Sequence, residues 1–155
     1  MSPIKLNLGC GLQCPEDWIN IDSSIGVKLS KRPIIKKLIY ALAPKSLGLP
    51  NIDWPSNTVW MDLTKTFQFE NESVDFIYSS HTIEHLTYEE ATFVFNECYR
   101  VLKPNGIIRI IVPDFGSLVE NYLSNKKTAP QVAALKFHEY ARYFEIPLPN
   151  SIFST

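Results

Sequence analysis

Short apolar runs alternate along the chain with longer segments in which apolar residues recur every three or four positions. Short runs bounded by Gly, Pro, Asn or Asp predict β-strands, and the longer spacing predicts helices. The predicted strands cover residues 4–8, 18–22, 58–62, 74–78 and 107–112. The predicted helices cover residues 27–43, 87–103, 115–123 and 130–144. Strands that alternate with helices are typical of an α/β domain.

Three local patterns define these predicted elements more closely. Thr87 and Glu90 have the spacing of a capping box, which predicts that a helix begins there. Residues 9–17 contain Pro15 and leave no room for a full helix between the first two strands. Residues 107–112 are almost continuously β-branched, which is typical of a strand covered on both faces. We therefore expect a mostly parallel sheet whose first connection lacks a helix.

Small or polar residues follow four of the predicted strands. Gly9, Asp22, Asp62 and the Ser-Ser-His cluster at 79–81 occupy these positions. Ligands of open parallel sheets bind at the carboxyl ends of the strands. The sequence thus predicts one domain over residues 1–155, an open α/β sheet of about five strands, with a ligand site at this edge.

Composition excludes several classes of protein. The 15 Lys and Arg residues nearly balance the 16 Asp and Glu residues, which disfavours a general nucleic-acid binder. Three cysteines without CxxC units indicate neither a disulfide framework nor a structural metal site, and suit a reducing cytosol. No recognisable export signal and no apolar run long enough to span a membrane is present. We expect a cytoplasmic protein.

Five segments resemble, in order, the motifs of class I S-adenosylmethionine-dependent methyltransferases of the type 11 branch. They are LNLGCG at 6–11, WINID at 18–22, MDL at 61–63, SVDFIYS through EHL at 73–86, and YRVLKPNG at 99–106. The resemblance implies a Rossmann-like sheet, S-adenosylmethionine as the cofactor, and methyl transfer to a small-molecule or saccharide acceptor. The second hypothesis is a catalytically degenerate relative that serves as a binding or interaction module.

The resemblance also implies a set of site residues. The residues expected at the cofactor are Asn7, Gly9, Cys10, Gly11, Asp22, Asp62, Leu63 and Ser79. Glycines allow close approach of the backbone to the cofactor, and the two aspartates would bind ribose and adenine. The alternative roles are turn glycines and loop-capping carboxylates. Asn7 replaces the acid that the family usually carries.

His81 and His85 are the nearest candidates for a catalytic base, which helps only when the acceptor has a proton to lose. Loop ordering is the alternative role for this segment. Residues 81–85 also match HxxEH, a zinc-peptidase pattern that needs both histidines on one face of a helix. Because the motif directly follows a strand and no further ligand cluster is present, no metal site is expected. A zinc hydrolase is the third and weakest hypothesis.

The basic helix near residues 28–45 allows three interpretations. It is a surface helix with a solvated basic face and an apolar face packed on the core, or a lid, or a peripheral membrane contact.

The strands that the family places after residue 112 are absent from the sequence, so the edge of the strand at 107–112 would be uncovered. We expect either a truncated form or a partner or second copy at this edge.

Overall fold

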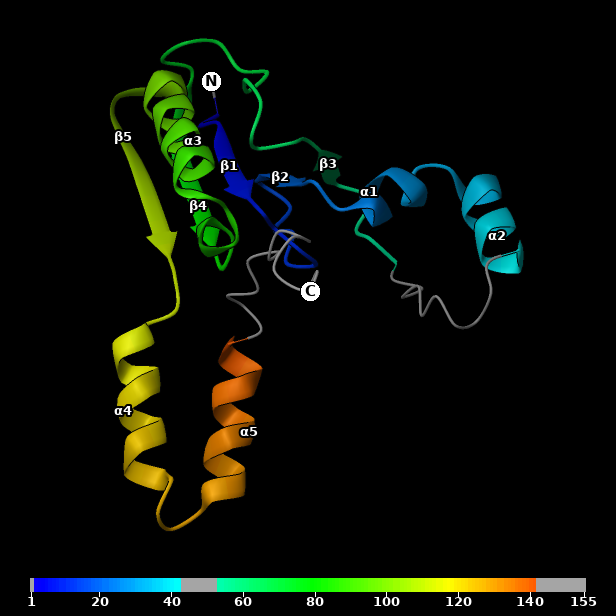
Figure 1. Ribbon diagram of the computed structural model, residues 1–155. Coiled ribbons are helices and arrows are strands. Elements are labelled where there is room, and N and C mark those ends of the chain that lie inside the picture. Colours follow the sequence, from blue (N-terminus) through cyan, green and yellow to red (C-terminus); the bar gives the residue numbers. More distant parts are fainter. Residues whose placement is uncertain (1, 43–52, 142–155) are drawn as a thin grey trace, which may run out of the picture.

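The computed structural model describes residues 2–42 and 53–141, and a five-stranded sheet lies at its centre (Figure 1). The strands are β1 (Lys5–Leu8), β2 (Ile19–Asp22), β3 (Thr58–Trp60), β4 (Val74–Ser80) and β5 (Leu102–Ile111). Their order is β3-β2-β1-β4-β5, and every neighbouring pair is parallel. This arrangement confirms the predicted Rossmann-like α/β sheet.

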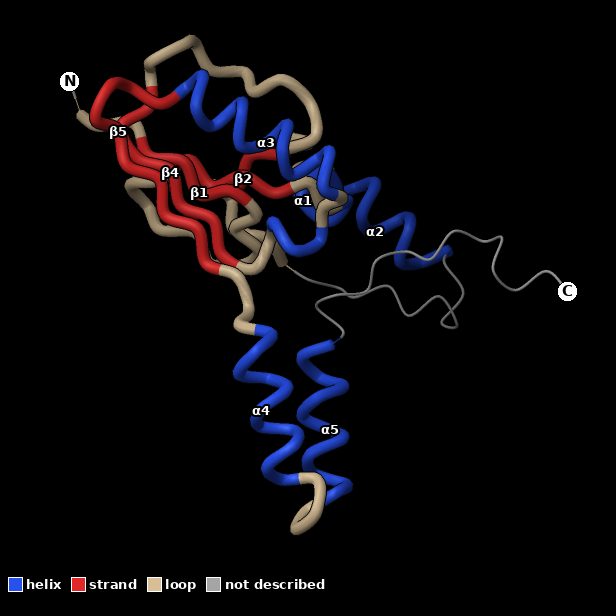
Figure 2. Tube along the Cα trace, turned by 60° about the vertical axis from the view of Figure 1, so that its left-hand side comes forward, coloured by secondary structure: helices blue, strands red, loops and turns tan. Residues whose placement is uncertain are grey.

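The helices lie in three places around the sheet. They are α1 (Ile25–Ser30), α2 (Pro33–Leu42), the 3-10 turn η2 (Ile83–His85), α3 (Tyr88–Val101), α4 (Phe115–Asn125) and α5 (Pro130–Ala141). Helix α3 packs along one face of the sheet, whereas α1 and α2 follow β2 toward one side of the molecule (Figure 1). Helices α4 and α5 form a hairpin that extends away from the sheet, as a turned view also shows (Figure 2).

The hydrophobic core lies between the sheet and α3. Leu6 and Leu8 of β1 align with Ile19 and Ile21 of β2, so that these side chains share one face of the pleated sheet. The core is formed by Leu6, Leu8, Ile21 and Ile77 of the sheet, by Val94, Cys98 and Val101 of α3, and by Met61, Leu63, Phe67 and Val74. Burial of this apolar surface is the main force that holds α3 on the sheet.

The connection between β1 and β2 covers part of the opposite face. Asn20 of β2 donates to the Pro15 carbonyl at 2.9 Å, and Asn7 of β1 donates to the Gln13 carbonyl at 2.9 Å. Trp18 meets Tyr78 edge to face, with ring centroids 6.3 Å apart. Residues 9–18 therefore replace the helix found at this place in other parallel sheets, as expected from their length.

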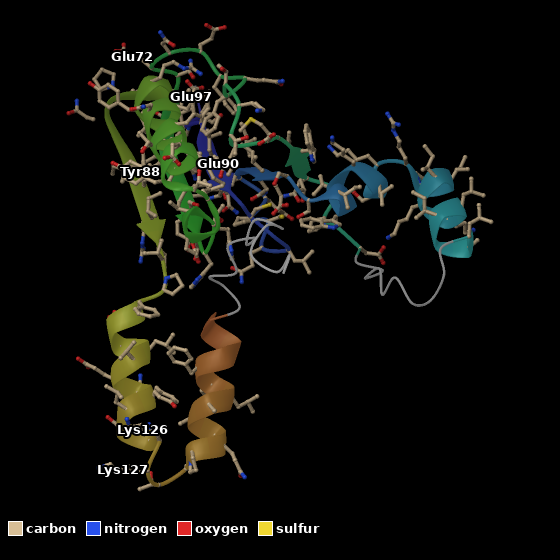
Figure 3. The ribbon with its side chains drawn as sticks, viewed as in Figure 1. Glu72, Tyr88, Glu90, Glu97, Lys126 and Lys127 are labelled. Carbon is tan, nitrogen blue, oxygen red and sulfur yellow. The ribbon has the colours of Figure 1, made fainter. Side chains whose placement is uncertain are left out.

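Helix α3 begins as predicted and anchors the chain between β3 and β4. Thr87 and Glu90 form the capping box, with bonds of 3.2 and 2.9 Å. Near the other end, the buried Glu97 accepts from the Phe67 amide at 2.6 Å and from Nη2 of Arg100 at 2.7 Å. Figure 3 places Glu90 and Glu97 on α3.

Several predicted boundaries differ from the observed ones. The helix expected over 27–43 is two helices, because Pro33 begins α2 and residues 31–32 separate it from α1. Ala43, the last residue of this predicted helix, and residues 44–45 of the basic helix expected near 28–45 lie outside the described residues. Residues 142–144 of the last predicted helix also lie outside them. Strand β3 ends at Trp60, β4 continues to Ser80, and α3 ends at Val101 rather than at the Pro104 turn.

The prediction that residues 107–112 are covered on both faces is wrong for the part of the chain that the structure describes. β5 is an edge strand that pairs with β4 alone. Ile107 is 58% exposed and Ile108 is 38% exposed. A β-branched run indicates that a strand tends to be buried, but it does not show which elements cover the strand. The expectation of an uncovered edge therefore fits this structure better.

Candidate active site

A cavity of about 520 Å³ opens at the carboxyl ends of β1 and β4. Its lining consists of Asn7, Gly9, Cys10, Gly11, Leu12, Gln13, Pro15, Trp18, Tyr78, Ser80 and His81. The cavity therefore gathers five of the predicted site residues at the edge of the sheet where a ligand was expected. The adjacent order of β1 and β4, which are far apart in the sequence, creates this place.

The glycine turn that follows β1 has a left-handed backbone at both glycines. Gly9 has φ +67° and Gly11 has φ +53°, a region that favours glycine. A Cβ at Gly9 would collide with the side chain of Thr82, so this position is also required for packing. A Cβ at Gly11 would meet no atom within 4 Å. Gly11 thus leaves open space at the wall of the cavity, where a ligand can approach the backbone.

Asp22 at the end of β2 holds the glycine turn. Its Oδ2 accepts a hydrogen bond from the Gly11 amide at 3.0 Å, and its Oδ1 accepts from the Ser24 amide at 2.8 Å. The carboxylate is buried, with 9% of the residue exposed. Asp22 therefore has the loop-capping role that the sequence left open. Each oxygen keeps a second lone pair, which leaves it able to accept a ligand hydroxyl as well.

Asp62 and Leu63 follow β3 and do not line this cavity. Oδ1 of Asp62 accepts from the amide and hydroxyl of Thr64 at 3.0 and 2.8 Å, and these bonds hold the pKa of Asp62 below its usual range. Leu63 is buried in the core. Asp62 is thus a charged group at the carboxyl edge of the sheet, while Leu63 offers its backbone alone.

Asn7 and Cys10 line the cavity while they also support its wall. The Asn7 amide nitrogen donates to the Gln13 carbonyl and to Oδ1 of Asn20 at 3.0 Å. Cys10 is buried, and its sulfur lies 3.6 Å from that of Cys14. Burial, followed by the bond with Cys14, raises the pKa of the Cys10 thiol to about 12. The thiol therefore stays protonated at neutral pH and is a packing group.

Ser79, which was expected at the cofactor, and its neighbour Ser80 lie on opposite faces of β4. Ser79 aligns with the buried Leu8, is fully buried itself, and leaves its hydroxyl without a hydrogen bond among the described residues. Ser80 points to the other face of the strand and lines the cavity with Tyr78. Sequence reasoning missed Tyr78, Ser80 and Trp18. The alternation of side chains along β4 was the signal that distinguishes Ser80 from Ser79.

The two histidines differ in their position. His81 lines the cavity and has a positive φ of 53°, which is strained for a residue with a side chain. Its Nδ1 lies 3.3 Å from Oε1 of Glu84, whose side chain is 5% exposed. The Glu84 carboxylate forms no hydrogen bond within the described part of the chain. His85 is exposed and is not part of the cavity lining.

The HxxEH segment has no α-helical geometry in this structure. Residues Ile83–His85 form the 3-10 turn η2, and α3 begins only after Thr87. Within residues 2–42 and 53–141, no group of three or more His, Cys, Asp or Glu side chains is placed to hold a metal ion. The pattern that a zinc peptidase requires, with both histidines on one face of an α-helix, is therefore not formed here.

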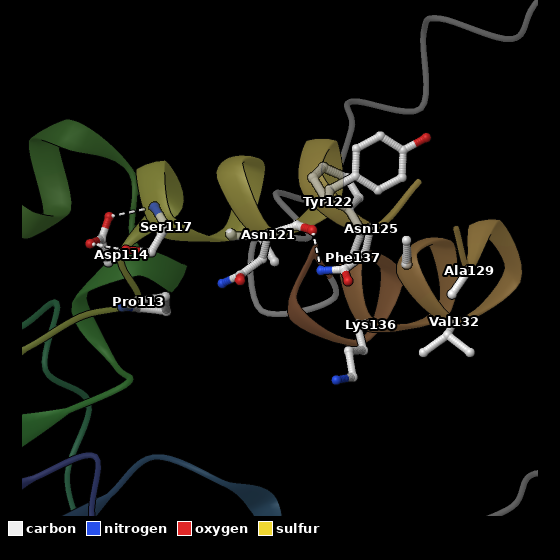
Figure 4. A pocket seen from close by; sticks show the side chains of 12 residues that line it. Pro113, Asp114, Ser117, Asn121, Tyr122, Asn125, Ala129, Val132, Lys136 and Phe137 are labelled. Atoms are coloured by element: carbon white, nitrogen blue, oxygen red, sulfur yellow. Dashed lines mark hydrogen bonds between the residues drawn. The ribbon is translucent and has the colours of Figure 1, made fainter. Parts of the chain in front are cut away.

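A second cavity, of about 610 Å³, lies between α4 and α5 (Figure 4). Asp114 caps α4 through Ser117 at one end, and Tyr122 and Phe137 meet in the middle with ring centroids 5.2 Å apart. The α4–α5 hairpin that carries it extends away from the sheet (Figure 2). None of the predicted site residues lines it.

Comparison with known families identifies the family of this chain. The model of the type 11 family, described as a methyltransferase domain, matches residues 6–110. This range covers more than half of the chain and includes every predicted site residue, so the chain belongs to the type 11 methyltransferase family. Family membership supports S-adenosylmethionine as the cofactor. No curated protein matches the chain.

Several solved structures are similar to this chain. An S-adenosylmethionine-dependent methyltransferase from Archaeoglobus fulgidus is 21% identical, with a TM-score of 0.51, over 89% of this chain and 59% of the other. The PH0226 protein from Pyrococcus horikoshii is 25% identical, with a TM-score of 0.49, over 78% and 53%. A methyltransferase from Mesorhizobium loti is 20% identical, with a TM-score of 0.42, over 69% and 44%. The chain thus spans roughly half the length of these proteins.

Proposed function

We propose that this chain binds S-adenosylmethionine at the glycine turn and transfers its methyl group to a small-molecule or saccharide acceptor. The open space beside Gly11 is the observation that carries the proposal, because this space lies in the wall of the cavity at the β1 and β4 ends. A bulky ligand can contact the backbone there. Asp22, which orients this turn through the Gly11 amide, is placed to bind hydroxyl groups of the same ligand.

The two histidines and Asp62 also have roles in this proposal. S-adenosylmethionine supplies a methyl group on a positively charged sulfur, and transfer depends mainly on in-line positioning of the acceptor. His81, which lines the cavity, is the group placed to accept a proton from the acceptor. The Glu84 carboxylate lies 3.3 Å from its Nδ1, where it would stabilise the imidazolium that forms when His81 takes up a proton. Asp62 would accept from the adenine amino group, whereas His85, which is exposed and outside the cavity lining, has a supporting role in η2.

Gly11→Ala tests the proposed binding site. The added methyl group enters the open space, so we expect the affinity for S-adenosylmethionine and for S-adenosylhomocysteine to fall about tenfold or more, measured by calorimetric titration. The left-handed backbone adds a stability cost of about 1 to 2 kcal/mol, which thermal unfolding measures separately. Gly116→Ala in α4 is the matched control, because Gly116 does not line this cavity and has no left-handed backbone.

Two results would contradict the proposal. If the folded Gly11→Ala variant binds S-adenosylmethionine as tightly as the parent chain does, the cofactor does not bind in this cavity. The complete absence of binding to the folded parent chain favours the second hypothesis, a catalytically degenerate binding or interaction module.

The three free thiols, of which Cys10 and Cys98 are buried, support a reducing compartment such as the cytoplasm. Among the described residues, no helix combines the length and the apolar character needed to cross a membrane.

We also propose that a second copy of the chain covers the open edge of β5. The free edge and the 58% exposure of Ile107 support this proposal. Ile107→Lys is expected to shift a dimer to a monomer in light scattering, whereas Leu135→Lys, at a residue of α5 that is 57% exposed, is expected to leave the mass unchanged. A monomeric parent chain at high concentration would remove this dimer.

A further inference from the structure

The segment formed by α1 and α2, residues 25–42, projects to one side of the sheet and is called here the α1–α2 arm (Figure 1). Its first helix is held close to the sheet. Nζ of Lys28 lies 3.3 Å from the ring centre of Trp60, and Nε1 of Trp60 donates to the Ser23 carbonyl at 2.9 Å. The second helix lies at the end of the arm, where it is attached through Lys36, whose Nζ is 2.7 Å from Oδ1 of Asp53.

Helix α2 exposes an apolar stripe. Ile34, Leu38 and Leu42 follow one another at four-residue steps, which places them on one face of the helix. They are 83%, 57% and 74% exposed. A helix of a folded domain normally buries such a stripe against the core. Here the described part of the chain leaves it uncovered.

The arm is also strongly basic. It holds five of the chain's 15 Lys and Arg residues and none of its 16 Asp and Glu residues. They are Lys28, Lys31, Arg32, Lys36 and Lys37. Helix geometry places Lys37 beside the apolar stripe, about 60° from Ile34 around the helix axis, and Lys36 on the opposite face of α2, about 160° from Leu38. Lys31, Arg32 and Lys37 are exposed. The apolar surface thus lies beside exposed positive charge, although the whole chain is nearly neutral.

We propose that the α1–α2 arm binds the surface of an anionic phospholipid bilayer. A helix with an apolar face and Lys on its polar face lies in the membrane interface, with the apolar face at the acyl boundary and the cations at the phosphates. Ile34, Leu38 and Leu42 would enter the interface, and the exposed cations would contact the headgroups. The proposed contact is peripheral.

The charge of the arm argues for this occupant over a second copy of the chain. Two arms that paired through their apolar stripes would bring five cations close to five others, and the arm itself holds no carboxylate, although Asp53 pairs with Lys36. Such like charges repel, whereas lipid phosphates neutralise them. The arm begins three residues after Asp22, so bound membrane would lie close to the proposed cofactor site while leaving donor binding a separate property.

Co-sedimentation of the full chain with vesicles tests the proposal. We expect binding to vesicles of phosphatidylcholine with phosphatidylglycerol, little binding to phosphatidylcholine alone, and release by added salt. The double variant Arg32→Glu with Lys37→Glu should weaken partitioning by about 30-fold or more, because each basic residue contributes about fivefold. The double variant Ile34→Ser with Leu38→Ser should also lose binding. These positions are exposed, so both variants should keep the thermal unfolding midpoint of the parent chain.

Matched controls lie on the α4–α5 hairpin. Lys126→Glu with Lys127→Glu changes the same charge at the tip of the hairpin (Figure 3), and Leu135→Ser removes an apolar side chain that is 57% exposed. We expect both controls to bind like the parent chain. The proposal is overturned if anionic vesicles do not retain the chain, if retention is independent of anionic lipid, or if the controls lose binding as the arm variants do. The proposal would also be overturned if the chain does not sediment with vesicles but forms a dimer that the double variant Ile34→Ser with Leu38→Ser dissociates.

Discussion

Asp22→Ala is expected to weaken the affinity for S-adenosylmethionine by about 2 to 3 kcal/mol, a loss of roughly 30- to 150-fold. Two effects combine in this variant. The carboxylate that would accept the ribose hydroxyls is removed, and the Gly11 and Ser24 amides lose the acceptor that lies 3.0 and 2.8 Å away. The glycine turn therefore becomes less well ordered at the point where the ligand should meet the backbone.

Calorimetric titration measures this loss, and circular dichroism shows whether the variant remains folded. Asp17→Ala is the matched control, because Asp17 lies in the same connection but its carboxylate pairs with Lys5 at the surface. We expect that control to bind the donor like the parent chain. A folded Asp22→Ala protein with unchanged affinity would show that Asp22 only caps the loop.

Glu97→Ala is expected to lower the free energy of unfolding by about 3 kcal/mol. Glu97 is the centre of a network that ties residues 67–71 to α3. Its loss leaves the Phe67 amide without a partner, and it removes both bonds to Arg100, at 2.8 and 2.7 Å. Arg100 also donates to the carbonyls of Phe67 and Phe69. Urea denaturation at neutral pH measures the change.

The effect of Glu97→Ala should depend on pH. The hydrogen bond from Arg100 holds the pKa of Glu97 below its ordinary value of 4.5 in the folded chain. The stabilisation is therefore fully present above about pH 4.5 and is lost as the pH falls through the lower folded value. The difference between parent and variant should narrow in acid. Glu89→Ala, at an exposed residue of α3, should change stability by less than about 0.5 kcal/mol, and an equal loss there would refute the network.

The β4 strand illustrates which part of the site could be predicted. The sequence indicates a strand that ends in polar residues; the structure confirms the strand and places it beside β1, next to the glycine turn. The choice between Ser79 and Ser80 depends on which face of β4 packs on α3. Since a shift of one residue exchanges the two faces, Ser80 rather than the predicted Ser79 is the hydroxyl that lines the cavity.

Local patterns in the sequence determined the strands, the capping box of α3, the glycine turn and the short first connection. These features depend on alternation, spacing and glycine freedom within a few residues. Tertiary structure alone decided the rest. Asp22 accepts from the Gly11 amide because β2 lies beside β1, and Glu97 accepts from the Phe67 amide thirty residues away. β5 lies at an edge of the sheet that the described residues leave open. Contacts between segments far apart in the chain depend on how strands and helices pack, which no local pattern encodes.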